Sequence, residues 1–146
     1  MGDFVEWPIM KPIKIFLALL PIIAVLDLAW IGWLMRDVYS RELGALARRN
    51  GDSLAPNVPA AALVYLLIPA GLVMFVLPRI ETSSLAMSAA WGAAFGLVMY
   101  GVYEFTNYAV IDGWSMKMVV YDLGWGCTLC AVSSLAMKWL SNVFGP

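Results

Sequence analysis

Three acidic residues lie inside or at the edge of strongly apolar stretches of this 146-residue chain: Asp27, Glu104 and Asp122. Carboxylates at membrane depth are costly, and they usually face the interior of a helix bundle or water. A buried carboxyl group close to others of like charge is suited to proton exchange or to binding a cation or an amine. The chain has no histidine, which excludes the most common general base and the Ser-His-Asp triad.

Large side chains with polar tips flank each carboxylate at helical spacing. Trp30 follows Asp27 by three residues, and Trp125 follows Asp122 by three. Residues three and four apart share one face of a helix, and Glu104 has further neighbours of this kind. The resulting candidate ligand-binding residues are Asp27, Trp30, Tyr100, Glu104, Asn107, Tyr108, Asp122 and Trp125. We predict no catalytic residues and no metal ligands.

The same acids have an alternative, structural interpretation. Glu104 and Asp122 would then lie among the lipid headgroups, and Asp27 would be protonated or paired with Arg36 or Lys117. A functional pocket is favoured because three acids converge without three matching buried bases.

Two cysteines, Cys127 and Cys130, form a C-x-x-C pattern inside an apolar segment. This pattern occurs in redox pairs, but buried cysteines also behave as small hydrophobic residues. No second pair exists to complete a metal site, so we predict a packing role. The cofactor, if there is one, is not indicated by the sequence.

The elements that must position these residues are apolar helices. Hydrophobic residues make up 62% of the chain and charged residues 13%, whereas about a quarter of the residues in soluble domains are charged. A helix needs about 20 apolar residues to cross a bilayer. The stretches that reach this length are residues 15–35, 60–77, 85–108 and 118–140. We predict an all-α membrane protein, a four-transmembrane-helix antiparallel bundle that forms one integral membrane domain over residues 1–146.

The connection between the first two spans is the one sizeable polar segment. Residues 36–50 are predicted to form an amphipathic helix in the membrane interface, followed by a loop over residues 50–59. The apolar positions at helical spacing are Tyr39, Leu43, Leu46 and Ala47. A small excess of basic residues favours the cytoplasmic side for the arginine-rich segment 36–49. An even number of spans puts both termini on one side of the membrane.

Counting residues from the span ends places all three acids in one half of the membrane. At about 1.5 Å per residue, Asp27 lies about 12 Å inside its span, and Glu104 and Asp122 lie about 6 Å inside theirs. Because the helices alternate in direction, these ends meet on one side, beneath the arginine-rich segment. We therefore predict a polar cleft with aromatic walls in that half.

The other half of the third span has small residues at intervals of four, which let membrane helices approach closely. They predict a helix-packing face at Ser88, Gly92 and Gly96. The partner is either another helix of this chain or the same helix of a second copy.

Proline and tryptophan mark the shape and the boundaries of the spans. Pro21 and Pro69 lie inside the first and second spans, where each is expected to kink its helix. Four tryptophans near predicted span ends are typical of the interfacial aromatic belt: Trp7, Trp33, Trp114 and Trp139.

Three motifs carry a resemblance to a known family. Residues 26–32 read L-D-L-A-W-I-G, residues 103–114 read Y-E-F-T-N-Y-A-V-I-D-G-W, and residues 119–126 read V-V-Y-D-L-G-W-G. They resemble the patterns L-D-x-x-W, Y-D-L-T-N-x-A-x-x-x-G-W and D-x-x-W-G of a bacterial family of small membrane proteins, the domain of unknown function two-one-seven-seven. Glu104 stands where the family pattern has aspartate, and it keeps the charge while reaching farther by one methylene.

The resemblance extends across nearly the whole chain. It implies an integral membrane location and a four-helix architecture, and it implies no activity. The positions that it marks are Asp27, Trp30, Glu104, Thr106, Asn107, Gly113, Trp114, Asp122, Trp125 and Gly126.

Three functions fit these residues. The first is binding or transport of a small cationic, amphipathic or lipid-like ligand at the acidic cleft, because aromatic faces attract cations and carboxylates supply the counter-charge. The second is a membrane-embedded enzyme acting on a lipid or isoprenoid, with Asp27 and Asp122 as acid and base, although no catalytic motif is present. The third is an accessory subunit of a larger membrane complex.

The expected partners follow from the same features. Membrane lipids surround the spans. A homodimer would complete a transport path, and a larger membrane complex would be the partner of an accessory subunit. A net charge of −1 indicates no nucleic-acid surface. We expect an integral membrane protein of the bacterial inner membrane.

Overall fold

The computed structural model describes residues 10–145, and most of them are helical. The long helices are α1 (Met10–Ala29), α3 (Val58–Gly71), α5 (Leu85–Val110) and α6 (Met116–Val143). Two of them are extended by π-helical turns, η1 (Trp30–Leu34) and η3 (Leu72–Val76). The shorter elements are α2 (Arg36–Leu43), the 3-10 turn η2 (Gly44–Leu46), β1 (Arg49–Asn50), β2 (Ser53–Leu54) and α4 (Leu77–Ile80).

Within residues 10–145, four continuous helical segments are long and apolar enough to cross a membrane, which confirms the predicted fold class. They are Met10–Leu34, Val58–Ile80, Leu85–Val110 and Met116–Val143. Each begins at or before the start of the predicted apolar stretch. In two of them the first turn is capped by a polar residue. The Asn57 side chain accepts a hydrogen bond from the Ala60 N–H, and the Ser84 hydroxyl accepts one from the Met87 N–H, both at 3.2 Å.

The two prolines inside the spans have different surroundings. Pro21 lies within continuous α1. Pro69 lies in α3 and is followed within three residues by the π-helical turn η3. The other π-helical turn, η1, closes with the Met35 N–H bonded to the Trp30 carbonyl at 2.8 Å. Single π turns widen a helix locally and often lie beside functional residues, and η1 begins three residues after Asp27.

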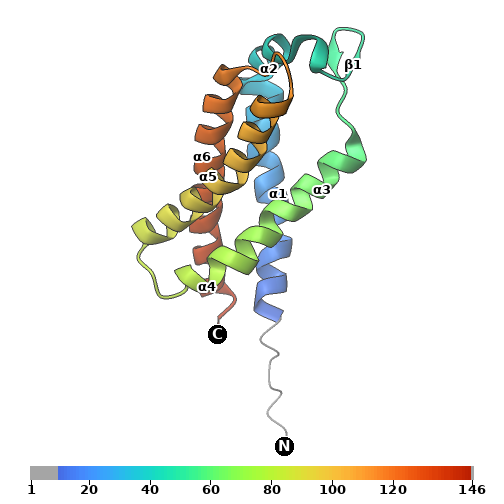
Figure 1. The fold of residues 1–146 in the computed structure, drawn as a ribbon. Helices are drawn as coiled ribbons and strands as arrows, with labels where there is room; N and C mark the ends of the chain where they lie inside the picture. The colour runs from blue at the N-terminus through green and yellow to red at the C-terminus, as the bar shows by residue number, and fades with distance from the viewer. Residues whose placement is uncertain (1–9, 146) are drawn as a thin grey trace, which may run out of the picture.

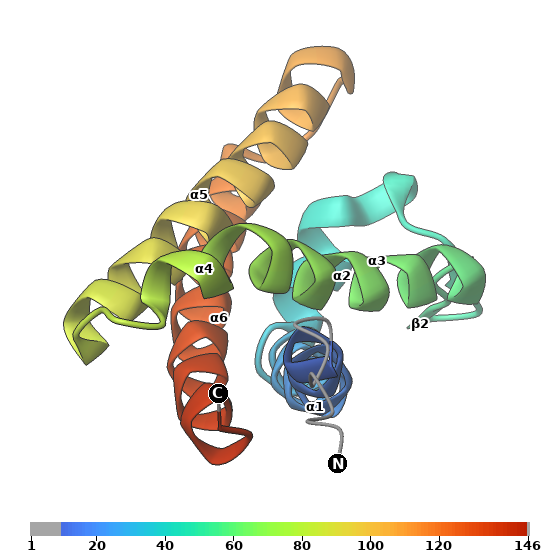
Figure 2. The same ribbon diagram turned by 90° about the horizontal axis from the view of Figure 1, so that it is seen from below.

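Helix α6 is the centre of the bundle. It contacts α5 along most of its length and also contacts α1, α2, α4 and η3. In Figure 1, α1 and α6 run side by side, while α3 and α5 are inclined to them. Figure 2 shows that α3 and α5 come together near α4 and diverge toward their other ends. The start of α1 and the end of α6 lie at the α4 end, and α2 and the α5–α6 turn lie at the opposite end (Figure 1).

The segment between the first two spans differs from its prediction. Helix α2 ends at Leu43 because Gly44 adopts a φ of 49°, so Leu46 and Ala47 lie outside it. The predicted loop contains a small antiparallel hairpin, with Arg49 opposite Leu54 and Asn50 opposite Ser53. Gly51, with a φ of 60°, is the first central residue of its two-residue turn, a position that favours glycine.

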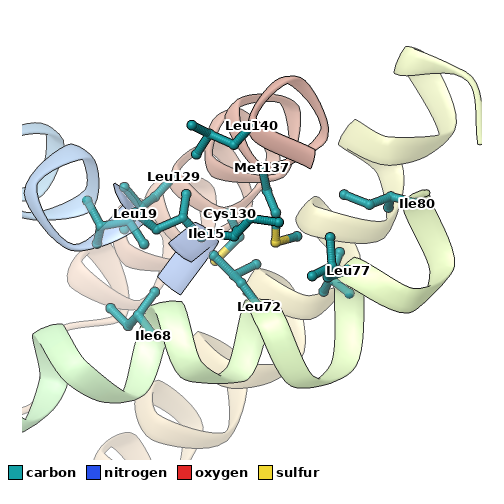
Figure 3. Close-up of a cluster of buried hydrophobic side chains, with 12 residues drawn as sticks. Ile15, Leu19, Ile68, Leu72, Leu77, Ile80, Leu129, Cys130, Met137 and Leu140 are labelled. Atoms are coloured by element: carbon teal, nitrogen blue, oxygen red, sulfur yellow. The ribbon is translucent and has the colours of Figure 1, made fainter. Parts of the chain in front are cut away.

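Apolar side chains fill the α4 end of the bundle. Figure 3 shows them converging from α1, α3, η3, α4 and α6. The cluster consists of Ile15, Leu19, Ile23, Ile68, Leu72, Val76, Leu77, Ile80, Leu129, Cys130, Met137 and Leu140. Cys130 is a free cysteine and 0% exposed within this cluster, in accordance with the predicted packing role.

The small-residue face of α5 packs against α6 of the same chain. Ser88, Gly92 and Gly96 are all buried. A Cβ atom on Gly92 would overlap the carbonyl of Cys130, and one on Gly96 would overlap the carbonyl of Gly126. The two backbones are therefore in direct contact, as small residues allow. A homodimer would have to use another surface, because this face is already covered.

Candidate functional site

Asp27 is held by hydrogen bonds from two other helices. Its side chain is 5% exposed, and it lies in the last three residues of α1. The Trp125 indole of α6 donates to one carboxylate oxygen at 2.8 Å, and the Tyr65 hydroxyl of α3 donates to the other at 3.0 Å. Neither Arg36 nor Lys117, the bases considered from the sequence, is among these partners. Asp27 thus links three spans through neutral donors.

The two tryptophans near these acids stack on one another. The Trp30 and Trp125 ring centroids are 4.5 Å apart, and their planes differ by 1°. The sequence pairs each tryptophan with the acid three residues before it on the same helix. In the structure, Trp125 donates to Asp27 on the neighbouring helix, and Trp30 donates to the Tyr39 oxygen. Helix packing decides where a long side chain reaches, and residue spacing alone does not.

Asp122 is reached from the connecting helix α2. The Tyr39 hydroxyl donates a hydrogen bond to Asp122 Oδ1, and the Trp30 indole donates to the Tyr39 oxygen at 3.3 Å. Asp122 is 5% exposed and Tyr39 is 8% exposed. Burial and the hydrogen bond to the Asp122 carboxylate both raise the pKa of Tyr39 above its ordinary value, so this hydroxyl stays protonated and acts as a donor.

Glu104 is the most deeply buried of the three acids, with 0% exposure. Its Oε2 atom accepts a hydrogen bond from the Trp114 indole at 2.8 Å. The Trp114 ring is in edge-to-face contact with Tyr103, at 6.2 Å between centroids. Glu104 on α5 and Asp122 on α6 are both buried where these two helices pack together, on the α2 side of the Gly96–Gly126 contact. Its Oε1 atom has no hydrogen-bond partner among residues 10–145.

The remaining predicted site residues lie beside this network. The Tyr100 ring packs where Gly126 would carry a side chain, so it fills the space between α5 and α6 below Glu104. Asn107 is half-buried and lies near the Tyr103 hydroxyl. Tyr108 is 47% exposed and borders an open recess at the α5–α6 turn that also includes Trp114. The structure therefore joins the acids and tryptophans but leaves Asn107 and Tyr108 at the margin.

Two lysines within residues 10–145 pair with other acids. Lys117 lies 3.2 Å from Glu42, and Lys11 lies 3.2 Å from Glu81. The Ser115 hydroxyl also donates to Glu42 at 2.7 Å. These contacts with Ser115 and Lys117 lower the pKa of Glu42. They join α2 to the start of α6, next to the Tyr39–Asp122 contact. The three buried acids have no ion pair within residues 10–145.

Three residues of the network were not among the predicted site residues. Tyr39 was assigned to the apolar face of the amphipathic segment. Trp114 was assigned to the aromatic belt, although the family resemblance also marked it. Tyr65 carried no signal, because nothing near it in the sequence is polar. Both Tyr39 and Trp114 have a polar tip next to a predicted span end, at the level of the acids, and that signal could have found them. Of the other belt residues, Trp33 and Trp139 are exposed on the bundle surface, and Trp7 lies outside the described residues.

A family model described as "Predicted membrane protein (DUF2177)" matches residues 12–139. The chain belongs to this family. No curated protein and no solved structure matches it. The matched residues of this DUF2177 protein include every acid and every donor of the network. Its membrane location therefore rests on both the family and the four apolar helices.

Proposed function

We propose that this DUF2177 protein binds a small cationic or cationic amphipathic ligand at the layer formed by Asp27, Glu104 and Asp122. The observation that carries the proposal is that these buried acids have no ion pair within residues 10–145. A carboxylate in an apolar environment must be neutralised by a proton or by a cation. Buried acids without a basic partner therefore favour the binding of positive charge.

Aromatic rings around the acids support an organic cation in particular. The stacked Trp30 and Trp125 rings lie next to Asp27, to which Trp125 is hydrogen-bonded, and aromatic faces attract ammonium groups. The described residues 10–145 hold no group of three or more acidic, cysteine or histidine side chains arranged to bind a metal ion. A protonated amine, which uses hydrogen bonds and cation–π contacts, therefore suits the layer better than a bare metal ion.

The position of the layer supports a ligand that enters from the membrane surface. Asp122 and Glu104 are joined to Tyr39 of α2 and to Trp114 of the α5–α6 turn, which both lie at one end of the bundle (Figure 1). An amphipathic amine would place its head at the acids and its tail among the lipids. We place α2 at the interface on the cytoplasmic side of a bacterial inner membrane, an orientation that accessibility labelling of single cysteines at exposed positions of residues 36–54 would test.

The test uses three ligands with the same tail and different heads: octylammonium, octanol and octanoate. Purified protein in lipid nanodiscs is titrated with each, and binding is followed by tryptophan fluorescence, because Trp30 and Trp125 lie at the acids. Octylammonium is expected to bind at least about tenfold more tightly than octanol, since a tenfold change needs only about 1.4 kcal/mol of extra interaction. Octanoate is expected to bind most weakly.

Variants of the acids locate the site. Asp27→Asn, Glu104→Gln and Asp122→Asn are expected to reduce the preference for octylammonium over octanol, and Glu81→Gln, at the opposite end of the bundle, serves as the matched control. Equal affinity for octylammonium and octanol in the wild-type protein would rule the proposal out. Neither an enzymatic role nor an accessory-subunit role is favoured by a specific contact within residues 10–145.

A further inference from the structure

The Glu104 and Asp122 carboxyl groups, buried on neighbouring helices, require an explanation of their own. They come from α5 and α6, which pack together, and both lie on the α2 side of the Gly96–Gly126 backbone contact, at exposures of 0% and 5%. Two ionised carboxylates buried near each other repel strongly, and such pairs hold a single proton between them. The two carboxyl groups therefore accommodate one proton more readily than two full charges.

The surrounding donors indicate which oxygen carries that proton. Glu104 Oε2 accepts from the Trp114 indole, and Asp122 Oδ1 accepts from the Tyr39 hydroxyl. Both of these oxygens are therefore acceptors. Glu104 Oε1 is buried and has no hydrogen-bond partner among residues 10–145. A proton on Oε1 would turn this oxygen into a donor toward Asp122 and would satisfy it.

The other ionisable groups around the pair supply no competing positive charge. Asp27 of α1 faces it and is held by Trp125 and by Tyr65 of α3. The remaining ionisable neighbours are Tyr39 of α2 and two of the three tyrosines of α5, Tyr100 and Tyr103. Lys117 at the start of α6 is engaged with Glu42. Within residues 10–145, the carboxyl pair thus meets only acids and phenols.

We propose that Glu104 and Asp122 share one proton, bound to Glu104 Oε1, and that a cationic ligand enters the layer by displacing it. In this exchange the O–H bond of Glu104 breaks, the proton leaves to water, and the ammonium head donates hydrogen bonds to both carboxylates. One positive charge replaces another, so the net charge of the pair together with its bound cation stays at minus one. The exchange therefore adds no uncompensated charge to the apolar interior. The second half of this inference rests on the proposed function, and the first half does not.

Infrared difference spectroscopy of the protein in nanodiscs tests the shared proton without any ligand. A protonated carboxyl group gives a carbonyl stretch separate from the carboxylate bands, and this stretch shifts in deuterated water. The wild-type protein at neutral pH is expected to show this band, and Glu104→Gln is expected to lose it. The Asp27→Asn variant is the matched control and should keep the band, because Asp27 already accepts two donors.

The Glu104→Gln variant is suited to this test because it preserves the hydrogen bonds. Its amide oxygen can accept from Trp114, and its amide N–H can donate to Asp122, as the protonated acid does. It is therefore expected to fold with the stability of the wild-type protein at neutral pH. Absence of the band in wild type, or its survival in Glu104→Gln, would overturn the assignment of the proton to Glu104.

Calorimetry in two buffers of different ionisation enthalpy then measures proton release on octylammonium binding. About one proton is expected to leave for each ligand bound to wild type, and about none for Glu104→Gln. Binding to wild type without proton release, or with the infrared band unchanged, would refute the exchange. No binding at all, with the band present in wild type, would refute the proposed function and the exchange while leaving the shared proton in place.

Discussion

From α4 up to the level of Gly96, the helices are joined by apolar side chains and by backbone contact, whereas near α2 they are joined by hydrogen bonds to carboxylates. The first region depends on shape, because Gly92 and Gly96 leave no room for a Cβ atom. The second depends on donors, because Trp125, Tyr65, Tyr39 and Trp114 each direct an N–H or O–H at an acid.

The difference shows which region depends on rigid packing and which region holds more polar groups than packing requires. A cluster of aliphatic side chains and touching backbones has one stable arrangement. The acid layer gains less from its shape, since a hydrogen bond between membrane helices contributes only about 0.6 kcal/mol on average. Four separate donors around three acids are more than is needed to join helices, and they keep the acids at fixed positions.

The largest expected effect comes from adding one methyl group to the backbone contact. Gly96→Ala should lower the free energy of unfolding by about 3 kcal/mol, because the new Cβ overlaps the Gly126 carbonyl, which cannot move aside. Gly124→Ala on α6 is the matched control, since a Cβ there meets nothing within 4 Å. Reversible unfolding in mixed detergent micelles measures both. Equal stability of the two variants would show that α5 and α6 are not in backbone contact.

A smaller loss is expected from removing one donor of the acid layer. Trp125→Phe keeps a ring to stack on Trp30 but leaves Asp27 with only the Tyr65 hydrogen bond. The cost should be about 2 kcal/mol, which is the order of leaving a buried acceptor unsatisfied. The exposed Trp33→Phe change is the control and should stay within about 0.5 kcal/mol of wild type. A neutral Trp125→Phe would mean that Asp27 is hydrated.

Removing the Tyr39 hydroxyl should have a local effect. Tyr39→Phe takes away the donor to Asp122, so α2 should be held less firmly, at a cost of about 1 kcal/mol. Hydrogen exchange of residues 36–43 is expected to speed up several-fold, with the exchange of α6 unchanged. Tyr121→Phe, at an exposed position of α6, is the control. Unchanged exchange in α2 would indicate that other contacts dock this helix.

The smallest effect concerns the surface contact next to Tyr39. The pKa of Glu42 is lowered by Ser115 and Lys117, so the contact stabilises α2 above the ordinary glutamate pKa of about 4.3. This stabilisation is lost as the pH falls through the lowered pKa in the folded protein. The hydrogen-exchange rate of α2, corrected for its intrinsic pH dependence, should therefore rise in acid in the wild-type protein. In Glu42→Gln this faster exchange should already be present at neutral pH. A parallel pH dependence of the exchange rate in the two proteins would contradict the prediction.

Some of this architecture could be predicted from local features of the sequence. The four spans follow from the length of their apolar runs, because a bilayer crossing leaves few alternatives to a helix. The common level of Asp27, Glu104 and Asp122 follows from counting residues along helices of alternating direction. The end of α2 was predicted too far toward the C-terminus, because the apolar spacing beyond Gly44 was given more weight than this glycine, which has a positive φ.

The sequence by itself therefore determined the membrane fold and the residues that bear charge inside it, because hydropathy and helical rise are local properties of the chain. Only the tertiary structure decided the partners. It placed α6 on the glycine face of α5, exchanged the tryptophans between Asp27 and the Tyr39–Asp122 pair, and brought Trp114 to Glu104. These contacts depend on the rotation and the crossing of whole helices, which result from all the packed side chains together.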